Sequence, residues 1–490
     1  MYIYSSEQIK QVDFQAEAQG FSLFALMENA GHNIAKAMMK KIKKNDTLVI
    51  LAGRGNNGGD GIVLARYLKN AGYNVYLCFP LGQPKTQVAQ AHLDYYEVNF
   101  SCTDLAFIPD QPTVIIDALL GVGTTLPLSD EIKKVVTWAN ALQARRYAVD
   151  IPTGLAANSG ALEQSENELD AIVFQADITF TLHGAKPSAF SLPSSAFYGD
   201  IQAISIGLSH DSSIKVTSKV EVRHSLAKRQ QADHKGSFGM SLLFAGSDHM
   251  PGSALLAAIG AIRSGTGRLM IGTSAFVSSI IATQVPEATY MKDGIYTLNH
   301  TKEIPHNITA IGIGPGLEDF AAIDDALDFL LQTDIPLVLD AGALYKNRSW
   351  KRDAITVLTP HPGEFSVLTG MSIQSIQENR IEIAQNFALN HEVILVLKGH
   401  HTVIAFPNGT VRVNPTGNTA LSKGGTGDVL TGMITSMLSY DKNPYSAIVN
   451  AVYLHGYCAE LWTETNGEAT MTASDFHTLL PKAFYHIQEE

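Results

Sequence analysis

The chain has 490 residues, of which 45% are hydrophobic and 17% are charged, and its formal net charge at pH 7 is −12. A chain of this length exceeds one ordinary hydrophobic core, so we expect two or three domains. The composition excludes a disordered protein, and the negative charge argues against a general affinity for nucleic acid or anionic membranes.

Cysteine usage and segment hydrophobicity narrow the expected location. The three cysteines, Cys78, Cys102 and Cys458, lie far apart and show no C-x-x-C spacing. This pattern excludes a disulfide framework and a cysteine zinc site, and it suits a reducing cytosol. The first 20 residues do not read as a signal peptide, and the most apolar stretch, residues 253–262, is too short to span a bilayer. We therefore expect a cytoplasmic protein without a membrane partner.

The first part of the chain alternates between two hydrophobic periods. After helical spacing in roughly the first 45 residues, we predict helices over residues 61–72, 86–97 and 130–142. The predicted strands are apolar runs at residues 47–52, 74–79, 113–121, 145–154, 176–182 and 200–208. Continuous apolar strands that alternate with helices predict a parallel sheet covered on both faces.

A second α/β series follows a polar stretch at residues 211–225, which we predict to be a linker between domains at 1–210 and 226–490. Its predicted helices span residues 253–264, 428–438 and 445–463. Its predicted strands lie at residues 241–246, 268–273, 308–316, 336–344, 354–364, 393–399 and 402–407. The two series share an architecture but no repeat period that can be aligned.

The loop after the first predicted strand contains GRGNNG at residues 53–58, which fits the G-x-G-x-x-G pattern of dinucleotide-binding turns. A dehydrogenase would also place an acid at the end of the next strand, but that strand ends in LCFP at residues 77–80. The loop instead carries Asn56, Asn57 and Asp60. An acid beside a diphosphate is unfavourable, whereas amides and carboxylates are hard oxygen ligands. The loop therefore does not predict a dehydrogenase.

Two further acids end neighbouring strands, Asp117 in VIID and Asp150 in YAVD. Strand ends of a parallel sheet meet at one edge, where ligands of α/β proteins bind. A single aspartate there is commonly a helix cap or turn former. Asp60, Asp117 and Asp150 together, with oxygens from Asn57 and Thr153, favour a ligand site in which a cation relieves the repulsion among the acids.

Three motifs of this half resemble one family: AGRGNNGGDG (52–61), IIDALLGVGTTLPL (115–128) and AVDIPTGL (148–155). They are similar to the epimerase domain of the NAD(P)H-hydrate repair enzymes. The resemblance implies that residues 1–210 form a Rossmann-like, three-layer α/β/α sandwich. It also implies interconversion of the R and S forms of NADHX and NADPHX, in which C6 of the nicotinamide ring is hydrated.

The same resemblance implies site residues. A potassium ion would be coordinated by Asn57, Asp117 and Thr153, where the threonine keeps the hydroxyl of the serine more common in the family. We predict that Asp150 is the acid/base of the epimerisation, because the reaction moves protons on and off the substrate. The implied contacts to the hydrate are Asn56, Asn57, Gly58, Gly59, Asp60, Gly121, Val122, Gly123, Thr124, Thr125, Leu126, Pro127 and Asp150.

The second half carries a glycine-rich segment, NTALSKGGTGD at residues 418–428, directly before an apolar helix. Gly424, Gly425 and Gly427 let backbone N–H groups converge on an anion at the helix N-terminus. Asp428 is then placed to deprotonate a hydroxyl that attacks a phosphate. The alternative is an ordinary glycine-rich turn capped by an aspartate. We favour a phosphoryl-transfer site.

A second candidate segment is LKGHHT at residues 397–402, at the end of a predicted strand. It is either a hairpin turn or a nucleotide contact with Lys398 near the phosphates. His400 and His401 would point to opposite faces of an extended chain and so would not ligate one metal. The chain contains no G-x-x-x-x-G-K-[ST] motif, which excludes a P-loop.

GGTGD after a strand with a KG turn resembles the ribokinase-like superfamily, in which the aspartate is the catalytic base. The closer similarity is to the dehydratase domain of the same repair family, carried by six motifs in order at residues 245–267, 311–317, 338–344, 359–365, 398–402 and 418–428. It implies a ribokinase-like α/β domain over residues 226–490. ADP or ATP, with magnesium, would phosphorylate the C6 hydroxyl of the S hydrate, and loss of phosphate would restore NAD(P)H.

The dehydratase resemblance also assigns residues. His361 could instead be a hydrogen-bonded core histidine, and Ser253 stands where the family usually has alanine. The implied contacts to the hydrate are Ser253, Gly316, His361 and Asp428. The implied contacts to the adenine nucleotide are Lys398, Gly399, His400, His401, Thr402 and Gly427.

We therefore predict a bifunctional repair enzyme whose substrates are NADHX and NADPHX, and the family resemblance implies a homo-oligomer. The alternative is a small-alcohol kinase, acting on a vitamin precursor, of the ribokinase-like superfamily. In that case the N-terminal half would be a ligand-binding or protein-binding module, which would not need the acids Asp60, Asp117 and Asp150.

Overall fold

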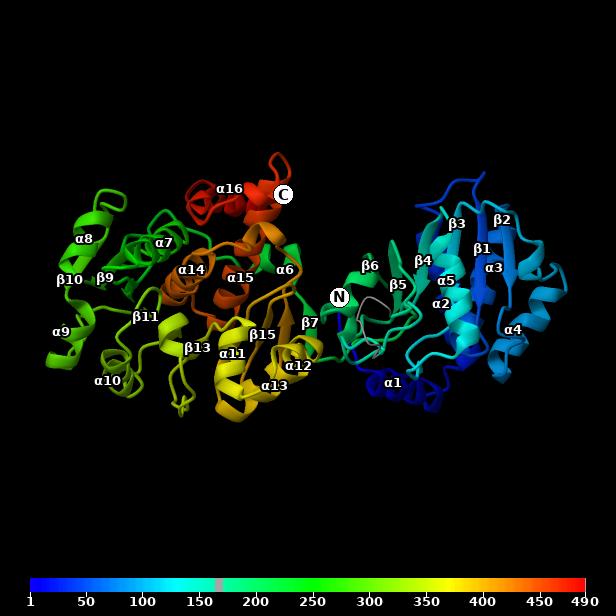
Figure 1. Ribbon diagram of the computed structural model, residues 1–490, viewed down its shortest axis with the longest axis horizontal. Helices are drawn as coiled ribbons and strands as arrows, with labels where there is room; N and C mark the ends of the chain where they lie inside the picture. The colour runs from blue at the N-terminus through cyan, green and yellow to red at the C-terminus, as the bar shows by residue number, and fades with distance from the viewer. Residues whose placement is uncertain (164–170, 490) are drawn as a thin grey trace. The chain divides into compact units, whose positions relative to one another are not determined.

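The computed structural model describes residues 1–163 and 171–489 (Figure 1). The chain divides into two compact units, residues 1–214 with 377–379 and residues 215–376 with 380–490. Within the described residues, no helix is both long and apolar enough to cross a membrane. Both units are α/β, as the sequence predicts.

The first unit is built on a six-stranded parallel sheet in the order β2-β1-β3-β4-β5-β6. The strands are β1 (Thr47–Ala52), β2 (Asn74–Cys78), β3 (Val114–Ala118), β4 (Arg145–Val149), β5 (Ile178–Leu182) and β6 (Asp200–Ile204). The helices are α1 (Ser6–Ala18), α2 (Leu23–Met38), α3 (Asn56–Asn70), α4 (Gln87–Glu97) and α5 (Asp130–Ala141).

The helices of this unit lie on both faces of the sheet, because the central strands are apolar on both sides. One core joins alternate strand residues to α2, α3 and α4, and the other joins the remaining strand residues to α5. The result is the three-layer sandwich expected from the sequence. The strand order reverses between β1 and β3, so the loops after these strands diverge and leave a crevice at the carboxyl edge.

The second unit contains a ten-stranded sheet in the order β10-β9-β8-β11-β12-β13-β14-β15-β16-β7. From β10 to β14 in this order, neighbouring strands pair in parallel. Strand β15 pairs antiparallel with β14 on one side and with β16 on the other. The strands are β7 (Ile214–Val216), β8 (Met240–Phe244), β9 (Arg268–Thr273), β10 (Thr289–Lys292), β11 (Ala310–Ile313), β12 (Leu337–Leu339), β13 (Thr356–Leu358), β14 (Ile394–Leu397), β15 (Val403–Ala405) and β16 (Val411–Val413).

Helices α14 and α15 dominate the core of the second unit, where they pack with α6 and α16 against the sheet (Figure 1). Helix α13 covers β14 and β15. The helices are α6 (Lys219–Ser225), α7 (Pro251–Arg263), α8 (Ala275–Ile281), α9 (Gly294–Thr301), α10 (Phe320–Leu330), α11 (Pro362–Thr369), α12 (Ile373–Glu378), α13 (Arg380–His391), α14 (Thr426–Tyr440), α15 (Pro444–Thr463) and α16 (Phe476–Glu489).

The segment predicted as a linker, residues 211–225, contains β7 and α6. Strand β7 lies at the edge of the second sheet beside β16, and the Ser218 hydroxyl caps α6 by accepting a hydrogen bond from the Glu221 N–H. A strand of three residues and a helix of seven are too short to produce a readable hydrophobic period. Most of this polar stretch therefore belongs to the second unit.

Helices α7 and α14 approach so closely that each contacts the other's backbone through a glycine. A Cβ on Gly432 of α14 would lie 1.9 Å from the Ala257 carbonyl oxygen, and a Cβ on Gly260 of α7 would lie 2.1 Å from the Val429 carbonyl oxygen. Real side chains cannot occupy such positions, so these two glycines fix the distance between the helices. The position of α14 is important because this helix begins at the glycine-rich segment.

We predict that Gly432→Ala lowers the free energy of unfolding of the second unit by about 3 kcal/mol, because the helices must separate to admit the methyl group. Urea denaturation followed by circular dichroism measures this loss. Gly252→Ala, on the partner helix α7, is the control, since a Cβ on Gly252 would meet no atom within 4 Å. Equal stability of the Gly432→Ala variant and the wild type would contradict the packing described.

Candidate functional sites

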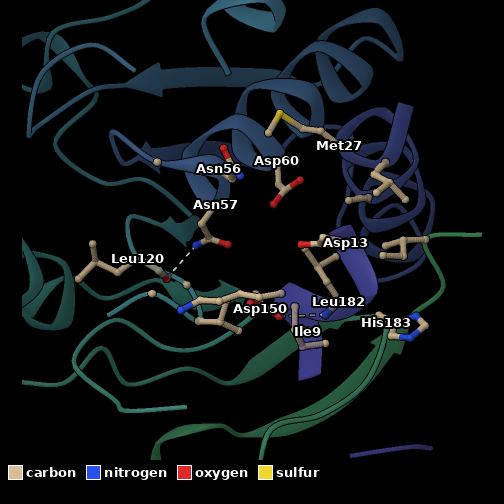
Figure 2. A pocket seen from close by; sticks show the side chains of 18 of the residues that line it. Ile9, Asp13, Met27, Asn56, Asn57, Asp60, Leu120, Asp150, Leu182 and His183 are labelled. Atoms are coloured by element: carbon tan, nitrogen blue, oxygen red, sulfur yellow. Dashed lines mark hydrogen bonds between the residues drawn. The ribbon is translucent and has the colours of Figure 1, made fainter. Parts of the chain in front are cut away.

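The first unit has a cavity of about 440 Å³ beside the crevice where the strand order reverses (Figure 2). Its wall combines α1 and α2 with the loops that follow β1, β3, β4 and β5. The structure thus brings together segments that are separated by more than 100 residues in the chain. The predicted hydrate contacts in this wall are Asn56, Asn57, Asp60, Gly121, Val122, Gly123, Thr124 and Asp150.

The other predicted contacts of these loops have a different environment. A Cβ on Gly58 would lie 2.0 Å from the Gly53 carbonyl oxygen, and one on Gly59 would lie 2.4 Å from the Met27 sulfur. These two glycines therefore allow α3 to start directly against β1 and α2. Thr125, Leu126 and Pro127 continue the second loop beyond the part that lines the cavity.

Asp150 follows β4 with φ at 69°, a left-handed conformation that is rare and strained for a residue other than glycine. Its carboxylate is buried and pairs with the ammonium of Lys186, which is only 1% exposed. The Leu182 N–H also donates to this carboxylate at 3.2 Å. The buried lysine thus compensates the charge of the predicted acid/base and fixes its position.

Lys186 is itself held by several oxygens, and this network explains why it can be buried. Its ammonium donates to the carbonyl oxygens of Leu182 (3.2 Å) and Gly184 (3.1 Å) and to the hydroxyl of Thr181 (3.3 Å). All of these groups lie in or just after β5. The sequence analysis did not select Lys186; the one available signal was a lysine, in HGAKPS, shortly after an apolar strand.

Two more carboxylates face the same cavity, Asp60 from α3 and Asp13 from α1 (Figure 2). Burial, with added repulsion from Asp150 and Asp13, raises the pKa of Asp60 well above its usual range, although Lys186 opposes this. Burial and then repulsion from Asp150 raise the pKa of Asp13 to about 6, again opposed by Lys186. The cavity therefore holds three carboxyl groups beside one buried lysine, Lys186, and the exposed Lys10 also lies in its wall. Asp13 has no sequence signal, since it occupies one position of an ordinary amphipathic helix.

The predicted potassium ligands are connected by hydrogen bonds around the loop after β3. The Asp117 carboxylate is fully buried and accepts hydrogen bonds from the Thr153 hydroxyl and N–H, both at 2.8 Å, and from the Leu119 N–H at 3.0 Å. The Asn57 side-chain amide donates to the Leu120 carbonyl oxygen at 2.8 Å. Burial raises the pKa of Asp117 to about 6, and these hydrogen bonds oppose the rise.

The contacts of Asp117 bear on its two interpretations, a turn-forming residue and a cation ligand. Its hydrogen bonds to the backbone are those of a turn-forming aspartate, and they orient the loop after β3. The amide oxygen of Asn57 lies beside the same loop, since a Cβ on Gly121 would be 3.4 Å from it, and such an oxygen suits a hard cation. Across residues 1–163 and 171–489, no cluster of three or more His, Cys, Asp or Glu side chains could hold a metal ion. The set of Asn57, Asp117 and Thr153 has only one such side chain, so it is not a cluster of this kind.

The second site lies where α14 begins. Gly425 precedes the helix with φ at 90°, a conformation suited to glycine, and Asp428 stands in the first turn. Burial raises the pKa of Asp428 to about 6; Asp340 and Glu364 add to this effect, while Ser253 and Lys398 oppose it. An acid with this pKa is ionised at neutral pH and can accept a proton there.

Lys398, which follows β14, places its ammonium between Asp340, which follows β12, and Gly427 at the start of α14. Its ammonium donates to Asp340 at 2.8 Å and lies 3.9 Å from Glu364, and a Cβ on Gly427 would be 3.3 Å from it. Although burial alone lowers the pKa of Lys398, these acids raise it above its usual value. Asp340 also accepts a hydrogen bond from Thr431 at 2.7 Å. Asp340 was not selected from the sequence, although it ends an apolar strand in VLDAGAL.

Residues 398–402 connect the antiparallel strands β14 and β15, so the hairpin interpretation of this segment is confirmed. The fully buried Arg380 holds the hairpin by donating to the backbone carbonyls of Leu397, Lys398 and His400. The expectation that His400 and His401 point to opposite faces is wrong. Their rings lie 3.9 Å apart between centroids, because the chain turns here and His401 has φ at 54°.

The hairpin also lines a cavity of about 240 Å³, so the two interpretations of this segment are compatible. All six predicted nucleotide contacts lie in its wall: Lys398, Gly399, His400, His401, Thr402 and Gly427. The opposite wall comes from residues 414–422, which precede α14. Burial lowers the pKa of His401 to about 3, so this histidine is neutral.

The remaining predicted hydrate contacts are Ser253, Gly316 and His361, of which Ser253 contacts Asp428. Ser253 of α7 hydrogen-bonds to the Asp428 carboxylate, and a Cβ on Gly316 would lie 2.7 Å from the Ser253 Cβ. His361 caps α11, accepting hydrogen bonds from the N–H groups of Gly363 and Glu364 on its Nδ1. Its side chain is 57% exposed, so the alternative of a buried core histidine is wrong.

Comparison with known proteins assigns both halves. Residues 23–188 match the family described as YjeF-related protein N-terminus, and residues 241–482 match the family described as NAD(P)H-hydrate dehydratase. The whole chain is 30% identical to the bifunctional NAD(P)H-hydrate repair enzyme of Moorella thermoacetica, of which it covers 98%.

Similarity to a dehydratase of Bacillus subtilis covers the second unit. The ADP-dependent (S)-NAD(P)H-hydrate dehydratase is 48% identical over 54% of this chain and 96% of the relative. A crystal structure of the ADP/ATP-dependent dehydratase, co-crystallised with ATP and Mg²⁺, is 47% identical. The match covers 56% of this chain and 98% of the crystallised chain, with a TM-score of 0.54.

The fold and the two sites define a two-domain α/β enzyme with a Rossmann-like first unit and a ribokinase-like second unit. The chain belongs to the family of bifunctional NAD(P)H-hydrate repair enzymes. Its first half epimerises NADHX and NADPHX, and its second half dehydrates the S epimers with ADP or ATP as co-substrate. These similarities do not favour the alternative of a small-alcohol kinase.

We predict that Lys186→Met lowers the kcat of epimerisation by about 100-fold or more, because the buried Asp150 loses the cation that compensates its charge. Chromatographic separation of the two NADHX epimers measures this rate. The exposed Lys36→Met is the matched control, and the dehydratase activity of both variants reports on the rest of the chain. Unchanged epimerisation in Lys186→Met would show that the pair is dispensable.

Proposed function

We propose that the cavity of the first unit is the epimerase site and that Asp150 is its acid/base. The observation that supports this assignment is the Asp150–Lys186 pair, a charged pair in the wall of a cavity large enough for part of a dinucleotide. The amides of Asn56 and Asn57 and the loop at residues 121–124 supply polar groups around it. These groups would bind the nicotinamide nucleotide half of the hydrate. The contacts at Gly58, Gly59 and residues 125–127 remain part of the proposal.

For the second unit we propose that Asp428 is the base that takes the proton from the C6 hydroxyl as it attacks the terminal phosphate. Backbone N–H groups at residues 424–427 and the N-terminus of α14 would stabilise the charge on the transferred group. Lys398, next to Gly427, would neutralise phosphate oxygens. Ser253, Gly316 and His361 would bind the hydrate, and the hairpin at residues 398–402 would bind the adenine nucleotide. Loss of phosphate from C6 and of a proton from the neighbouring C5 then yields NAD(P)H.

We further propose that a magnesium ion accompanies the nucleotide, where it would neutralise the phosphates. The co-crystallisation of the Bacillus subtilis dehydratase with ATP and Mg²⁺ supports this. We also propose a potassium ion at Asn57, Asp117 and Thr153. The oxygen donors of this set suit a hard cation, which would lower the cost of burying Asp117 and steady the loop after β3.

We place the protein in the cytoplasm as a homo-oligomer. The three cysteines are free, and Cys78 and Cys458 are buried, which suits a reducing compartment. Fractionation of cells and light scattering of the purified protein test the two parts of this proposal separately.

One assay tests the proposed bifunctional reaction. We expect a mixture of R- and S-NADHX, supplied with ADP or ATP and magnesium, to be converted completely to NADH. With ATP as the co-substrate, one phosphate is released for each NADH formed. NADH absorbance and phosphate are followed together. Conversion that stops near half would mean that only the dehydratase acts within the assay, and absence of NADH formation would contradict the whole assignment.

The raised pKa of Asp428 predicts a pH dependence for the dehydratase. A general base must be ionised, and burial raises the pKa of this carboxyl to about 6. We therefore expect kcat/KM for S-NADHX to fall as the pH decreases through about 6 and to be constant just above it. Asp428→Asn should lose about 10²- to 10⁴-fold of the activity at every pH. The pH profile of the epimerase, measured on the same samples, is the control. A dehydratase profile without an acidic limb would contradict the role.

A further inference from the structure

The epimerase cavity contains two carboxyl groups that the proposed role of Asp150 does not use. Asp60 comes from the second turn of α3 and Asp13 from the middle of α1, and both line the cavity. Within the described part of the chain, neither carboxyl group has a hydrogen-bond partner, and Asp60 is buried. An isolated carboxylate is costly to bury without such a partner. The arrangement therefore favours a proton on the buried Asp60 or a positive charge between the two groups.

The buried Lys186 does not supply that positive charge. The ammonium of Lys186 is directed at Asp150 and at the oxygens of β5 and the loop after it. With all three carboxyl groups ionised, the cavity would carry three negative charges against the buried Lys186 and the exposed Lys10. Figure 2 shows Asp60 and Asp150 reaching the cavity from different sides, with Asp13 between their elements. The site thus has an acid on one side and a lysine-paired base on the other.

We propose that Asp60 is the proton donor of the epimerisation, working across the substrate from Asp150, and that the reaction proceeds by loss and re-addition of the C6 hydroxyl. This inference rests on the assignment of the cavity as the epimerase site. Asp13 is a positioning residue in it, since its charge acts on Asp60. Three carboxyl groups around one cavity are suited to stabilise a positively charged ring.

The epimerisation would proceed in two steps, loss of the C6 hydroxyl as water and addition of a new water. In the first, the Asp60 carboxyl gives its proton to the C6 hydroxyl, the C6–O bond breaks with its electron pair on oxygen, and water leaves. The lone pair of ring nitrogen N1 forms an N1=C6 double bond, which places one positive charge on the ring. In the second step a water attacks C6 from the opposite face, and the π electrons return to N1.

The attacking water loses a proton to the Asp150 carboxylate, and transfer of that proton to Asp60 through water restores the starting state. The reverse epimerisation uses the same two groups with their roles exchanged, as reversibility of the step requires. No oxidant, reductant or further reactant is needed. The hydroxyl of the product therefore comes from solvent in every turnover.

The experiment measures oxygen exchange during epimerisation. Purified R-NADHX is incubated with the full-length enzyme in H₂¹⁸O without nucleotide, and the separated epimers are analysed by mass spectrometry. We expect the S-NADHX formed by the enzyme to contain one ¹⁸O per molecule, after correction for exchange without enzyme. Enzymatic epimerisation that leaves ¹⁶O in the product would overturn the proposed route.

Variants test the donor itself. We expect Asp60→Asn to lower the kcat of epimerisation by 100-fold or more with KM changed less than about threefold, because the amide keeps the shape but has no proton to give. Asp94→Asn, an exposed aspartate on α4, is the matched control. Wild-type kcat in Asp60→Asn would overturn the donor role. Absence of epimerisation in the wild-type protein would instead reject the epimerase site as a whole.

Asp13→Asn separates a positioning role from a structural one through the pH profile. Repulsion from Asp13 favours the protonated form of Asp60, so its removal should move the alkaline limb of kcat to lower pH. The other charged or titratable groups facing the cavity, Lys10, Asp150, His183 and Lys186, are unchanged in this variant. A uniform loss of kcat without movement of that limb would overturn the positioning role of Asp13.

Discussion

Both sites of this protein depend on one constraint, namely that parallel strands release all their carboxyl ends at the same edge of a sheet. In the first unit this edge collects Asp117, Asp150 and the loop at residues 53–60, and in the second it collects Asp340 and Lys398. Polar residues that are far apart in the chain are thereby placed close together. The strands themselves are apolar on both faces, so the edge is where polar chemistry can be placed.

The two sites solve the same electrostatic problem in similar ways. Each contains a lysine paired with an aspartate that ends a strand, Lys186 with Asp150 and Lys398 with Asp340. Each also contains a second aspartate near the N-terminal end of a glycine-initiated helix, and burial raises the pKa of that group. A compensated charge beside an acid of raised pKa gives a site both a stable negative group and an exchangeable proton.

The sequence predicts the strand and helix alternation well, because each buried strand is a continuous apolar run and each helix repeats its own period. It also selects Asp150, Asp428 and Lys398, which stand beside glycine-rich turns or at strand ends. It does not reveal Asp13, whose role depends on the docking of α1, or Lys186, whose partner is 36 residues away. Short elements such as β7 were missed because three residues carry no period. Tertiary contact, which local patterns do not contain, determines these features.

The position of Asp13 has a consequence for how folding and activity are coupled in the first unit. The two main cores of this unit are formed by the sheet with α2, α3, α4 and α5, whereas α1 contributes Ala16 to a small separate cluster. The sheet can therefore be complete while α1 is undocked. In that state the cavity lacks one wall and one of its three acids. Docking of this peripheral helix therefore completes the wall of the cavity, and a substrate bound in the cavity would in turn stabilise the docked helix.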